Sequence, residues 1–441
     1  MVEPFWLPLL ILDVAALLVM IFAERFSPRT LIFWITVVAV LPFLGFILYL
    51  IFGCTLYSRR LFSRKSESDA RYMVGEQERL SGRDGAQADT IRALGADVCT
   101  TGNAVRFFWD RSEVIPDMVR DIRSAQRSVH HMARRLPRGM EQVHKAAMEA
   151  VSRGVDVCIM TSSLGFGRTP GLRRMRKAGV RYHTFHRIPY SLLSVRPANR
   201  NMRSMAVIDG HVAYQGRGAA IRIEGPAAAR LERRFMADWA HATGERMVPD
   251  DSDVIRSENG AGVQVVSDGP DLDDRKPLFT TYSDIIIHSE RTLYMAFPYL
   301  LPTDEIYSNV KLAVASGVDV RILLPRRGKH WYQSWNSLAA SNPLMRIGAK
   351  VYFADRTLGK CVIILDGRLC CVGSGDFSSR PLAQDFNTDC LIYSEEVAEE
   401  AGRSFMEELG DSAECHPDMY DSRSVGDMFR IAIARLLMFF N

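Results

Sequence analysis

Met-Ala-Val-Ile-Asp-Gly at residues 205–210 returns as Ile-Ile-Leu-Asp-Gly at residues 363–367. In each copy a short apolar run ends in Asp-Gly, and a second apolar run follows at 212–214 and at 369–372. This pattern predicts a buried strand, a tight turn and another buried strand. The same local structure is therefore expected once in each half of the chain.

The elements upstream of these two stretches also follow one order, a helix, a strand, a helix and a strand. The runs lie at 114–128, 129–133, 140–153 and 154–160 in the first half, and at 282–291, 292–297, 303–316 and 317–324 in the second. Strands that alternate with helices predict an α/β fold. Two copies predict a pseudo-twofold body with a site at the seam, although a repeat that serves packing alone is the alternative.

Composition is that of a large globular protein. The chain has 441 residues, 47% of them apolar, enough for two or three domains. Ordinary contents of Gly (31) and Pro (19) exclude a disordered or collagen-like chain. The eight cysteines include no Cys-x-x-Cys pair, which indicates neither a disulfide framework nor a zinc site. We place the two halves at 104–248 and 249–423, and an apolar C-terminal helix at 424–441.

Two apolar stretches precede the body. The stretch at about 5–23 is apolar except for Asp13, and the stretch at about 31–53 contains no charged residue. A bilayer core requires about 20 apolar helical residues, so both are expected to be transmembrane helices within residues 1–58. Asp13 is unfavourable in lipid and weakens the case for the first.

Positive charge follows the second stretch. The bases there are Arg59, Arg60, Arg64 and Lys65, whereas the connection between the stretches offers Arg25 and Arg29 beside Glu24. The positive-inside rule therefore predicts a multi-pass protein of the cell membrane with its body on the cytoplasmic side. Residues 59–103 are interpreted as a basic juxtamembrane segment and linker.

Several motifs along the chain resemble those of bacterial cardiolipin synthases of the phospholipase D superfamily. They are Leu-Pro-Phe-Leu-Gly-Phe at 41–46, Ile-Glu-Gly-Pro at 223–226, Phe-Met-Ala-Asp-Trp at 235–239, Val-Gln-Val-Val-Ser-Asp-Gly-Pro at 263–270, Phe-Pro-Tyr at 297–299, and Gly-Ser at 373–374 with Arg380. The resemblance covers essentially the whole chain. It implies two tandem phospholipase D-like repeats that form a pseudo-twofold α/β body behind an N-terminal transmembrane helical hairpin.

The resemblance also implies a chemistry. The family carries one His-x-Lys-x-x-x-x-Asp motif in each repeat, and the two motifs meet at the seam. One imidazole forms a phosphohistidine, the other acts as acid and base, and the lysines hold the phosphate oxygens. The family reaction joins two phosphatidylglycerols into cardiolipin and releases glycerol, and it implies no metal or other cofactor.

This chain departs from both motifs. Counted back from Asp209, the His and Lys positions hold Met202 and Ser204, and counted back from Asp366 they hold Gly359 and Cys361. Further family positions, two for Asn and one for Glu, fall at Ala219, Asp376 and Asn387. Neither a thioether nor a glycine can become a phosphohistidine, and losing a nucleophile lowers activity by several powers of ten. The retained acids Asp209 and Asp366 are then expected to be vestigial and to form turns.

Four polar residues close to the motifs are candidates for binding lipid phosphate: Arg203, Lys360, Ser374 and Arg380. Convergence of Arg203, Lys360 and Arg380 on an open cleft would favour this role. A closed apolar cavity around Met202 and Gly359 would argue against it.

Other nucleophiles stay open at this stage. His130 and His131 lie in a strand expected at the seam, and Cys361 stands beside Lys360. Each of these side chains also has an ordinary interpretation as an interior residue. His183 and His186, three residues apart, are a weaker candidate pair for a metal.

Two further segments are expected near the membrane surface. Ten Lys or Arg and no acid occur from Arg168 to Arg203, interleaved with Phe185, Tyr190, Leu192 and Leu193. This composition favours contact with an anionic leaflet, with a solvated basic face as the alternative. Residues 428–440 are too short to span a membrane and predict either an interfacial helix or a helix packed on the core.

The sequence thus predicts a membrane-anchored protein of the cardiolipin synthase family whose partners are anionic phospholipid (phosphatidylglycerol or cardiolipin) and the membrane, without nucleic acid. We expect it to be inactive or nearly so alone, as a pseudoenzyme that binds lipid or supports an active paralogue or a homodimer. Whether it is an enzyme stays open. The alternatives are an active transferase with a rebuilt centre and a membrane scaffold without a ligand.

Overall fold

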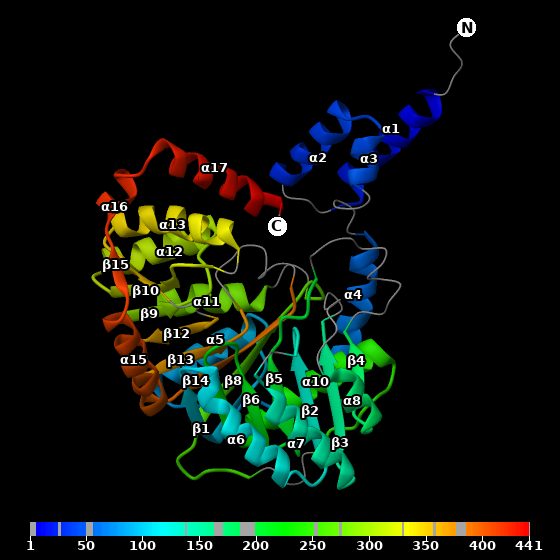
Figure 1. Ribbon diagram of the computed structural model, residues 1–441, viewed down its shortest axis with the longest axis vertical. Coiled ribbons are helices and arrows are strands. Elements are labelled where there is room, and N and C mark those ends of the chain that lie inside the picture. Colours follow the sequence, from blue (N-terminus) through cyan, green and yellow to red (C-terminus); the bar gives the residue numbers. More distant parts are fainter. Residues whose placement is uncertain are drawn as a thin grey trace.

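The computed structural model describes residues 6–24, 28–49, 56–136, 139–162, 171–185, 199–250, 255–272, 276–328, 330–355, 359–375 and 385–440. A single mixed sheet of fifteen strands forms the centre of this described part (Figure 1). The first half contributes β1 (Cys99–Phe108), β2 (Ser128–Ala133), β3 (Asp156–Thr161), β4 (Arg181–Thr184), β5 (Met205–Ile208), β6 (Val212–Gln215) and β7 (Ala220–Glu224). The second half contributes β8 (Ala261–Asp268), β9 (Thr292–Ala296), β10 (Asp319–Pro325), β11 (Lys350–Ala354), β12 (Val362–Leu365), β13 (Leu369–Gly373), β14 (Asn387–Tyr393) and β15 (Ala413–Cys415).

The order of the strands is the same on both sides of the antiparallel β1–β8 pair. Outward from β1 come β7, β6, β5, β2, β3 and β4, and outward from β8 come β14, β13, β12, β9, β10 and β11, with β15 at the edge. The outer strands form two groups, β2–β3–β4 and β9–β10–β11. Neighbouring strands within each group run parallel. Because parallel strands need helical crossovers, this arrangement requires the alternating helices that the sequence predicts, and the α/β fold is confirmed.

The helices of the body cover both faces of the sheet. They are α6 (Arg111–Ser124), α7 (Glu141–Ser152), α8 (Leu172–Lys177), α10 (Pro226–Thr243), α11 (Pro277–Ile287), α12 (Asp304–Ala315), α13 (Trp331–Arg346), α15 (Glu395–Gly410), α16 (Pro417–Asp421) and α17 (Val425–Phe440). Leu231 of α10 and Phe405 of α15 belong to one buried cluster that also contains Phe107 of β1 and Val263 of β8. One apolar core therefore runs through both halves of the body.

The segment expected as a linker also contains regular structure. Its helices are α4 (Leu56–Asp69) and α5 (Gly82–Ala93). Phe62 of α4 is buried in the shared core, and Ile91 of α5 is buried against the second half. Contacts with residues far along the chain thus hold this segment in place, and a local reading of its polar sequence does not reveal them.

The N-terminal region differs from the two long helices that were expected. It consists of α1 (Trp6–Phe22), α2 (Pro28–Val40) and α3 (Leu44–Leu48). The helix ends before Pro42, which has no N–H to continue it, and Phe43 adopts a left-handed φ of 65°. None of the helices in the described ranges is both long enough and apolar enough to cross a bilayer. The multi-pass topology therefore stays a prediction.

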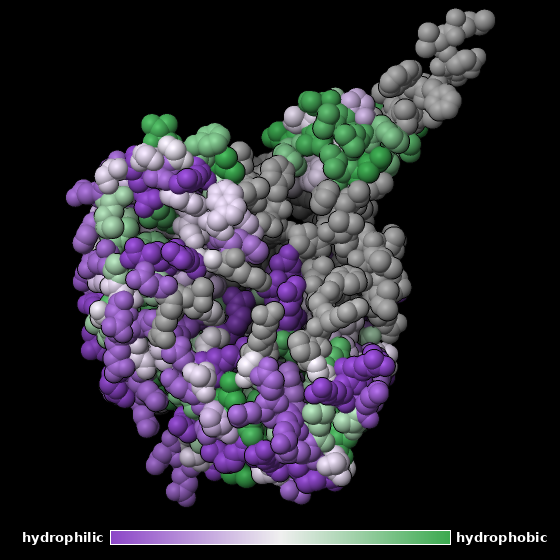
Figure 2. Space-filling view, in the orientation of Figure 1, coloured by the Kyte–Doolittle hydropathy of each residue, from purple (hydrophilic) through white to green (hydrophobic). Residues whose placement is uncertain are grey.

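Close backbone packing holds α3 against α2. A Cβ on Gly45 would lie 2.6 Å from the carbonyl oxygen of Val37, so this position requires glycine. The hydroxyl of Tyr49 donates to Oε1 of Glu24 at 3.2 Å, which ties the end of this region back to α1. Apolar side chains gather on the outer surface of these helices in Figure 2, where Ile11, Phe22 and Ile32 are exposed.

Candidate functional site

The first motif segment lies directly before β5, at the edge of the sheet where β2 ends. Met202 is buried, and its N–H donates to the carbonyl of Phe386 in the second half at 2.8 Å. The carbonyl of Ser204 accepts the N–H of Gly216 at 3.1 Å. The family's first His and Lys positions therefore stand at a boundary with the second half, but neither side chain found there can transfer a proton at neutral pH.

The second motif segment repeats this arrangement before β12. The carbonyl of Cys361 accepts the N–H of Gly373 at 3.2 Å, as that of Ser204 accepts Gly216. A Cβ on Gly218 would lie 2.6 Å from the carbonyl carbon of Gly359, so the two halves touch here through their backbones. The two motif segments therefore meet at the seam.

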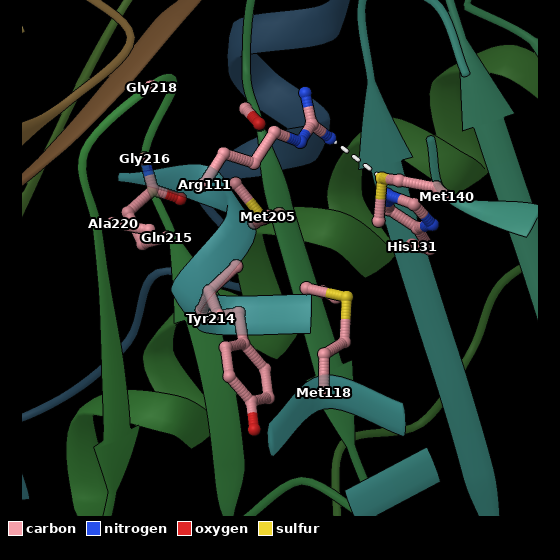
Figure 3. Close-up of a pocket in the computed structure, with 13 residues that line it drawn as sticks. Arg111, Met118, His131, Met140, Met205, Tyr214, Gln215, Gly216, Gly218 and Ala220 are labelled. Atoms are coloured by element: carbon pink, nitrogen blue, oxygen red, sulfur yellow. Dashed lines mark hydrogen bonds between the residues drawn. The ribbon is translucent and has the colours of Figure 1, made fainter. Parts of the chain in front are cut away.

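A small cavity lies beside the first motif segment (Figure 3). Its space for water is about 30 Å³, room for one or two molecules. Ser204, His131, Arg111 and Gly218 line it, and Nη2 of Arg111 lies 2.7 Å from Sδ of Met140. Burial, with the charges of His144 and Arg111, lowers the pKa of His131 to about 3, so the imidazole is neutral at physiological pH.

His130 points to the other face of the sheet. Its ring stacks on Phe235 with centroids 4.7 Å apart, and Nδ1 lies 3.1 Å from Oε1 of Glu232. His130 also brings a nitrogen within 4.8 Å of Cys158 Sγ and an Asp156 oxygen, a set of atoms that could hold a metal. Both Asp156 oxygens, however, already accept hydrogen bonds from Arg181, at 2.9 and 2.6 Å. Since adjacent residues in a strand face opposite ways, His130 and His131 do not form a joint site.

Arg203 is completely buried rather than exposed at a cleft. Its Nη1 donates to Asp238 of α10 at 2.7 Å, and its Nε donates to Oγ1 of Thr388 at 2.9 Å. The guanidinium also lies 5.2 Å from the ring centroid of Phe386. Arg203 thus joins the first motif segment to α10 and to the start of β14 as part of the interior.

Asp238 and Arg203 belong to a larger buried cluster of alternating charges, the α4 ion cluster. Its members are Lys65, Asp69, Arg203, Arg234, Asp238 and Asp271. Nζ of Lys65 lies 3.0 Å from Oδ1 of Asp238 and 3.0 Å from Oδ2 of Asp271. Burial opposes ionisation of Asp238, but the charges of Arg203, Arg234 and Lys65 hold its pKa below the ordinary value. Lys65, expected as a juxtamembrane charge, is instead an interior partner of both halves.

Lys360 lies in a separate ion cluster. Its Nζ is 2.9 Å from Oδ1 of Asp110 and 3.5 Å from Oε2 of Glu408, and 4.5 Å from the ring centroid of Trp109. Lys360 is buried, and its described partners differ from those of Arg203. Arg203 and Lys360, whose convergence on an open cleft would favour phosphate binding, are therefore part of the interior at two different places.

The retained acids Asp209 and Asp366 hold the opposite ends of their strands. Oδ1 of Asp209 accepts the N–H groups of Arg127 and Ser128 at 2.7 and 2.8 Å, and Oδ2 accepts that of Gln126 at 2.8 Å. Asp366 accepts the same three N–H groups of the second half, from Glu290, Arg291 and Thr292. Both residues have left-handed backbones, with φ of 51° and 52°, as the Asp-Gly turns require.

The remaining predicted site residues have different outcomes. Ser374 is buried, and its Oγ donates to Oδ1 of Asn387, the family's Glu position, at 3.2 Å. Ala219, at an Asn position, is buried. Arg380, Asp376 and His186 lie outside the described residues.

The basic segment is also only partly described. Phe185, expected in an interfacial loop, is fully buried against Phe386. Arg181 pairs with Asp156 and Glu245, whereas Arg173 and Arg176 of α8 are exposed. Tyr190, Leu192 and Leu193 lie outside the described residues.

The C-terminal helix α17 packs on α13. Ile431 and Ala434 are buried, and the side-chain amide of Asn336 on α13 donates to the carbonyl of Ala434 at 2.8 Å. Met428 and Phe429 are exposed on the other side of the helix. One side of α17 is therefore packed on the core, as one of the two expectations for this helix has it, and the other side exposes apolar side chains.

Sequence reasoning did not single out three arginines at the motif end of the sheet. Arg134 follows β2, Arg200 precedes Met202, and Arg217 stands between Gly216 and Gly218 after β6. The order of strands in the sheet brings these positions together, and the sequence does not contain that order.

Comparison with known proteins finds a different family match in each part of the chain. Residues 282–409 match the family described as cardiolipin synthase, PLD-like domain, and residues 11–53 match the phospholipase D-nuclease N-terminal family. The cardiolipin synthase of Oceanobacillus iheyensis is 27% identical over 97% of this chain and 97% of its own. That of Listeria monocytogenes is 28% identical over the same shares. The crystal structure of a phosphatidylserine synthase from Haemophilus influenzae has a TM-score of 0.55 and 10% identity, over 76% of this chain and 95% of that one, a likeness of fold alone.

Proposed function

We propose that the chain is a membrane-associated member of the cardiolipin synthase family that binds anionic phospholipid without performing phosphatidyl transfer on its own. The observation that carries this proposal is the content of the four family positions. Met202, Ser204, Gly359 and Cys361 stand where the reaction needs two imidazoles and two ammonium groups. A chain that keeps the scaffold and lacks these groups retains a binding surface but no nucleophile, acid or base.

The histidines of β2 support inactivity rather than a rebuilt centre. His130 is buried between Phe235 and Glu232, on the face away from the motif cavity. His131 lines that cavity, but a pKa of about 3 makes its imidazole a weak base and a poor acceptor of a proton from an alcohol. Cys361 is buried, with Nη2 of Arg217 at 3.8 Å from its sulfur. Of the three candidates His130, His131 and Cys361, the thiol of Cys361 is the one that remains for an active transferase.

The N-terminal helices supply the proposed membrane contact. Their outer surface exposes large apolar side chains, a composition that favours lipid contact. We include in the proposal two membrane-crossing segments within residues 1–58, a body of two tandem repeats on the cytoplasmic side, and an active paralogue or a second copy of the chain as the functional partner. The basic residues of 59–64 and the matching strand orders of the two halves support these parts.

The test is cardiolipin formation by the purified full-length protein in phosphatidylglycerol liposomes, with free glycerol measured alongside. No cardiolipin and no glycerol above the protein-free control are expected, together with retained binding to anionic liposomes. Turnover would overturn the proposal. Cys361→Ser would then show whether the thiol carries the reaction, with Cys370→Ser, another buried cysteine, as the matched control.

Restoring the motifs provides a second measurement. A variant with Met202→His, Ser204→Lys, Gly359→His and Cys361→Lys returns the four family groups. A Cβ at Gly359 would lie 3.9 Å from Cα of Gly218, an ordinary van der Waals contact, so a Cβ fits there without displacing the backbone. Turnover that appears only in this variant would show that the missing side chains are the cause of inactivity.

A further inference from the structure

Arginine side chains gather at the edge of the sheet that carries the motif segments. In the sheet, β5 lies between β2 and β6, and Met205 at its start pairs with Met132 of β2 and Gln215 of β6. Arg134 follows Met132 by two residues, and Arg217 follows Gln215 by two. This register brings Arg134 and Arg217 to the same edge as Ser204, on either side of the first motif segment.

Arg200 reaches the same place from the chain segment before the motif. Its N–H donates to Oδ1 of Asp385 at 2.8 Å, and its carbonyl accepts the N–H of Phe386 at 2.8 Å. Arg217 reaches across the seam, where its Nη2 lies 3.8 Å from Sγ of Cys361, the second family Lys position. The three arginines therefore border both motif segments.

The electrostatics of these arginines favour an anion. All three are half-buried, so water screens their mutual repulsion only in part. Burial and the charges of Arg200, Arg217 and Arg135 lower the pKa of Arg134 to about 10. The carboxylate of Asp385 acts in the opposite direction and raises this pKa. At neutral pH the guanidinium groups are still charged. An additional negative group among them would relieve the repulsion.

We propose that Arg134, Arg200 and Arg217 bind the phosphate of an anionic phospholipid headgroup at the seam, in place of the two lysines that the motifs lack. Guanidinium groups hold phosphate oxygens through paired hydrogen bonds, and they neither donate a proton to a leaving group nor attack phosphorus. A site built from them binds a phosphodiester and leaves it intact. This inference rests on the proposed function, because it assigns the lipid that the inactive protein holds.

The test measures binding of short-chain phosphatidylglycerol to the full-length protein in detergent by isothermal titration calorimetry. Arg134→Gln with Arg217→Gln is expected to weaken binding about a hundredfold or more, the effect of losing two charge-assisted hydrogen bonds. The matched control is Arg123→Gln with Arg403→Gln, which removes the same charge from the exposed surfaces of α6 and α15. The control is expected to bind within about twofold of the unchanged protein.

Four results would overturn the proposal. The first is equal weakening in both double variants, which would mean non-specific charge attraction. The second is no binding by the unchanged protein, and the third is no effect of the Arg134 and Arg217 changes. The fourth is binding of inorganic phosphate as tight as that of phosphatidylglycerol, which would identify a site for the free ion. Should the glutamine pair fail to fold, Arg134→Lys with Arg217→Lys decides. A several-fold loss of phosphatidylglycerol affinity in this lysine variant supports a bidentate contact between guanidinium and phosphate. An unchanged affinity contradicts it.

The two proposals fail separately. Cardiolipin formation by the unchanged protein would overturn the proposed inactivity and leave the binding result as it stands. Equal phosphatidylglycerol affinity of the two double variants would overturn the arginine site. The proposed inactivity would then still stand.

Discussion

Two aspartates that the family uses in its motifs act here through backbone hydrogen bonds. Because Asp209 accepts three N–H groups, Asp209→Ala leaves all three without that acceptor and is expected to lower the free energy of unfolding by about 2–4 kcal/mol. Asp366→Ala should have a similar effect, since its contacts are the same. Denaturant unfolding of the detergent-solubilised protein measures both.

The asparagine variants are the control for these changes. Asp209→Asn and Asp366→Asn keep a side-chain oxygen and tolerate the left-handed backbone, so each should lose less stability than the alanine variant. If the alanine variants unfolded at the same denaturant concentration as the unchanged protein, the structural role of these acids would be wrong.

Asp268, at the end of β8, provides a pH-dependent signature. Burial raises its pKa to about 7, while hydrogen bonds from the N–H groups of Gly269 and Leu278 act in the other direction. Between about pH 4 and 7 the folded state therefore binds more protons than the unfolded state, and the free energy of unfolding falls as pH rises through this window. A pKa difference of one unit corresponds to about 1.4 kcal/mol.

Asp268→Asn removes this titration and keeps one oxygen, which can accept the N–H of Gly269, whereas the amide nitrogen replaces the oxygen that accepts the N–H of Leu278. The variant should lose less stability than the unchanged protein between pH 5 and 8, as measured by melting temperature across buffers. Asp411→Asn, an exposed carboxyl after α15, is the control and should follow the unchanged protein. Parallel profiles for Asp268→Asn would contradict the raised pKa.

Residue-level expectations from the sequence succeeded where the signal was local. The Asp-Gly turns at Asp209 and Asp366 follow from residue type alone. The environments of Lys65 and Arg203 could not be predicted in this way, because Asp271 lies 206 residues from Lys65 and Asp238 lies 35 residues from Arg203. A charge is neutralised by whichever element the fold brings near, and a sequence window does not contain that element.

At the scale of elements, α4 carries a charge that the body needs. Lys65→Met leaves Asp69, Asp238 and Asp271 with one cation fewer in a buried setting, and is expected to destabilise the protein by about 3–5 kcal/mol. Arg64→Met removes an exposed charge from the same helix and should change stability by less than about 0.5 kcal/mol. Thermal unfolding in detergent measures both. Equal effects would show that Lys65 contributes only as a surface charge.

The two sides of helix α17 allow packing on the core and contact with the membrane to be tested separately. Ile431→Ser on the buried side should lower the melting temperature and expose apolar surface of α13. Phe429→Ser on the outer side should leave the melting temperature unchanged and weaken binding to anionic vesicles, if this side lies in the headgroup region. Unchanged vesicle binding for Phe429→Ser would assign α17 to the core alone.

At the scale of the whole molecule, the two halves share one sheet and one core. β1 pairs with β7 of its own half and with β8 of the other, and the cluster containing Leu231 and Phe405 crosses between them. Calorimetry of the full chain should therefore show a single unfolding transition that Asp209→Ala and Asp366→Ala both shift as a whole. Two transitions, with each variant shifting only one, would mean that the halves unfold independently.

The α/β order of the body follows from apolar periodicity, and the structure confirms it. The N-terminal region does not follow the same logic, since an uncharged run from Leu31 to Gly53 predicts one helix by composition. Pro42 and the fit of Gly45 against Val37 replace it by α2 and α3. Steric contacts of single atoms determine where a helix breaks. An average hydropathy value carries no information about such contacts.

The contacts of Lys65 also set an order of events during synthesis. This lysine leaves the ribosome long before Asp238 and Asp271, the last of which follows 206 residues later. At a synthesis rate of about 5–20 residues per second, Asp271 is made on the order of 10–40 s after Lys65. Throughout that time α4 has to remain hydrated next to newly made apolar helices. The N-terminal part of the nascent chain therefore lacks these ion pairs until the second half has begun to emerge.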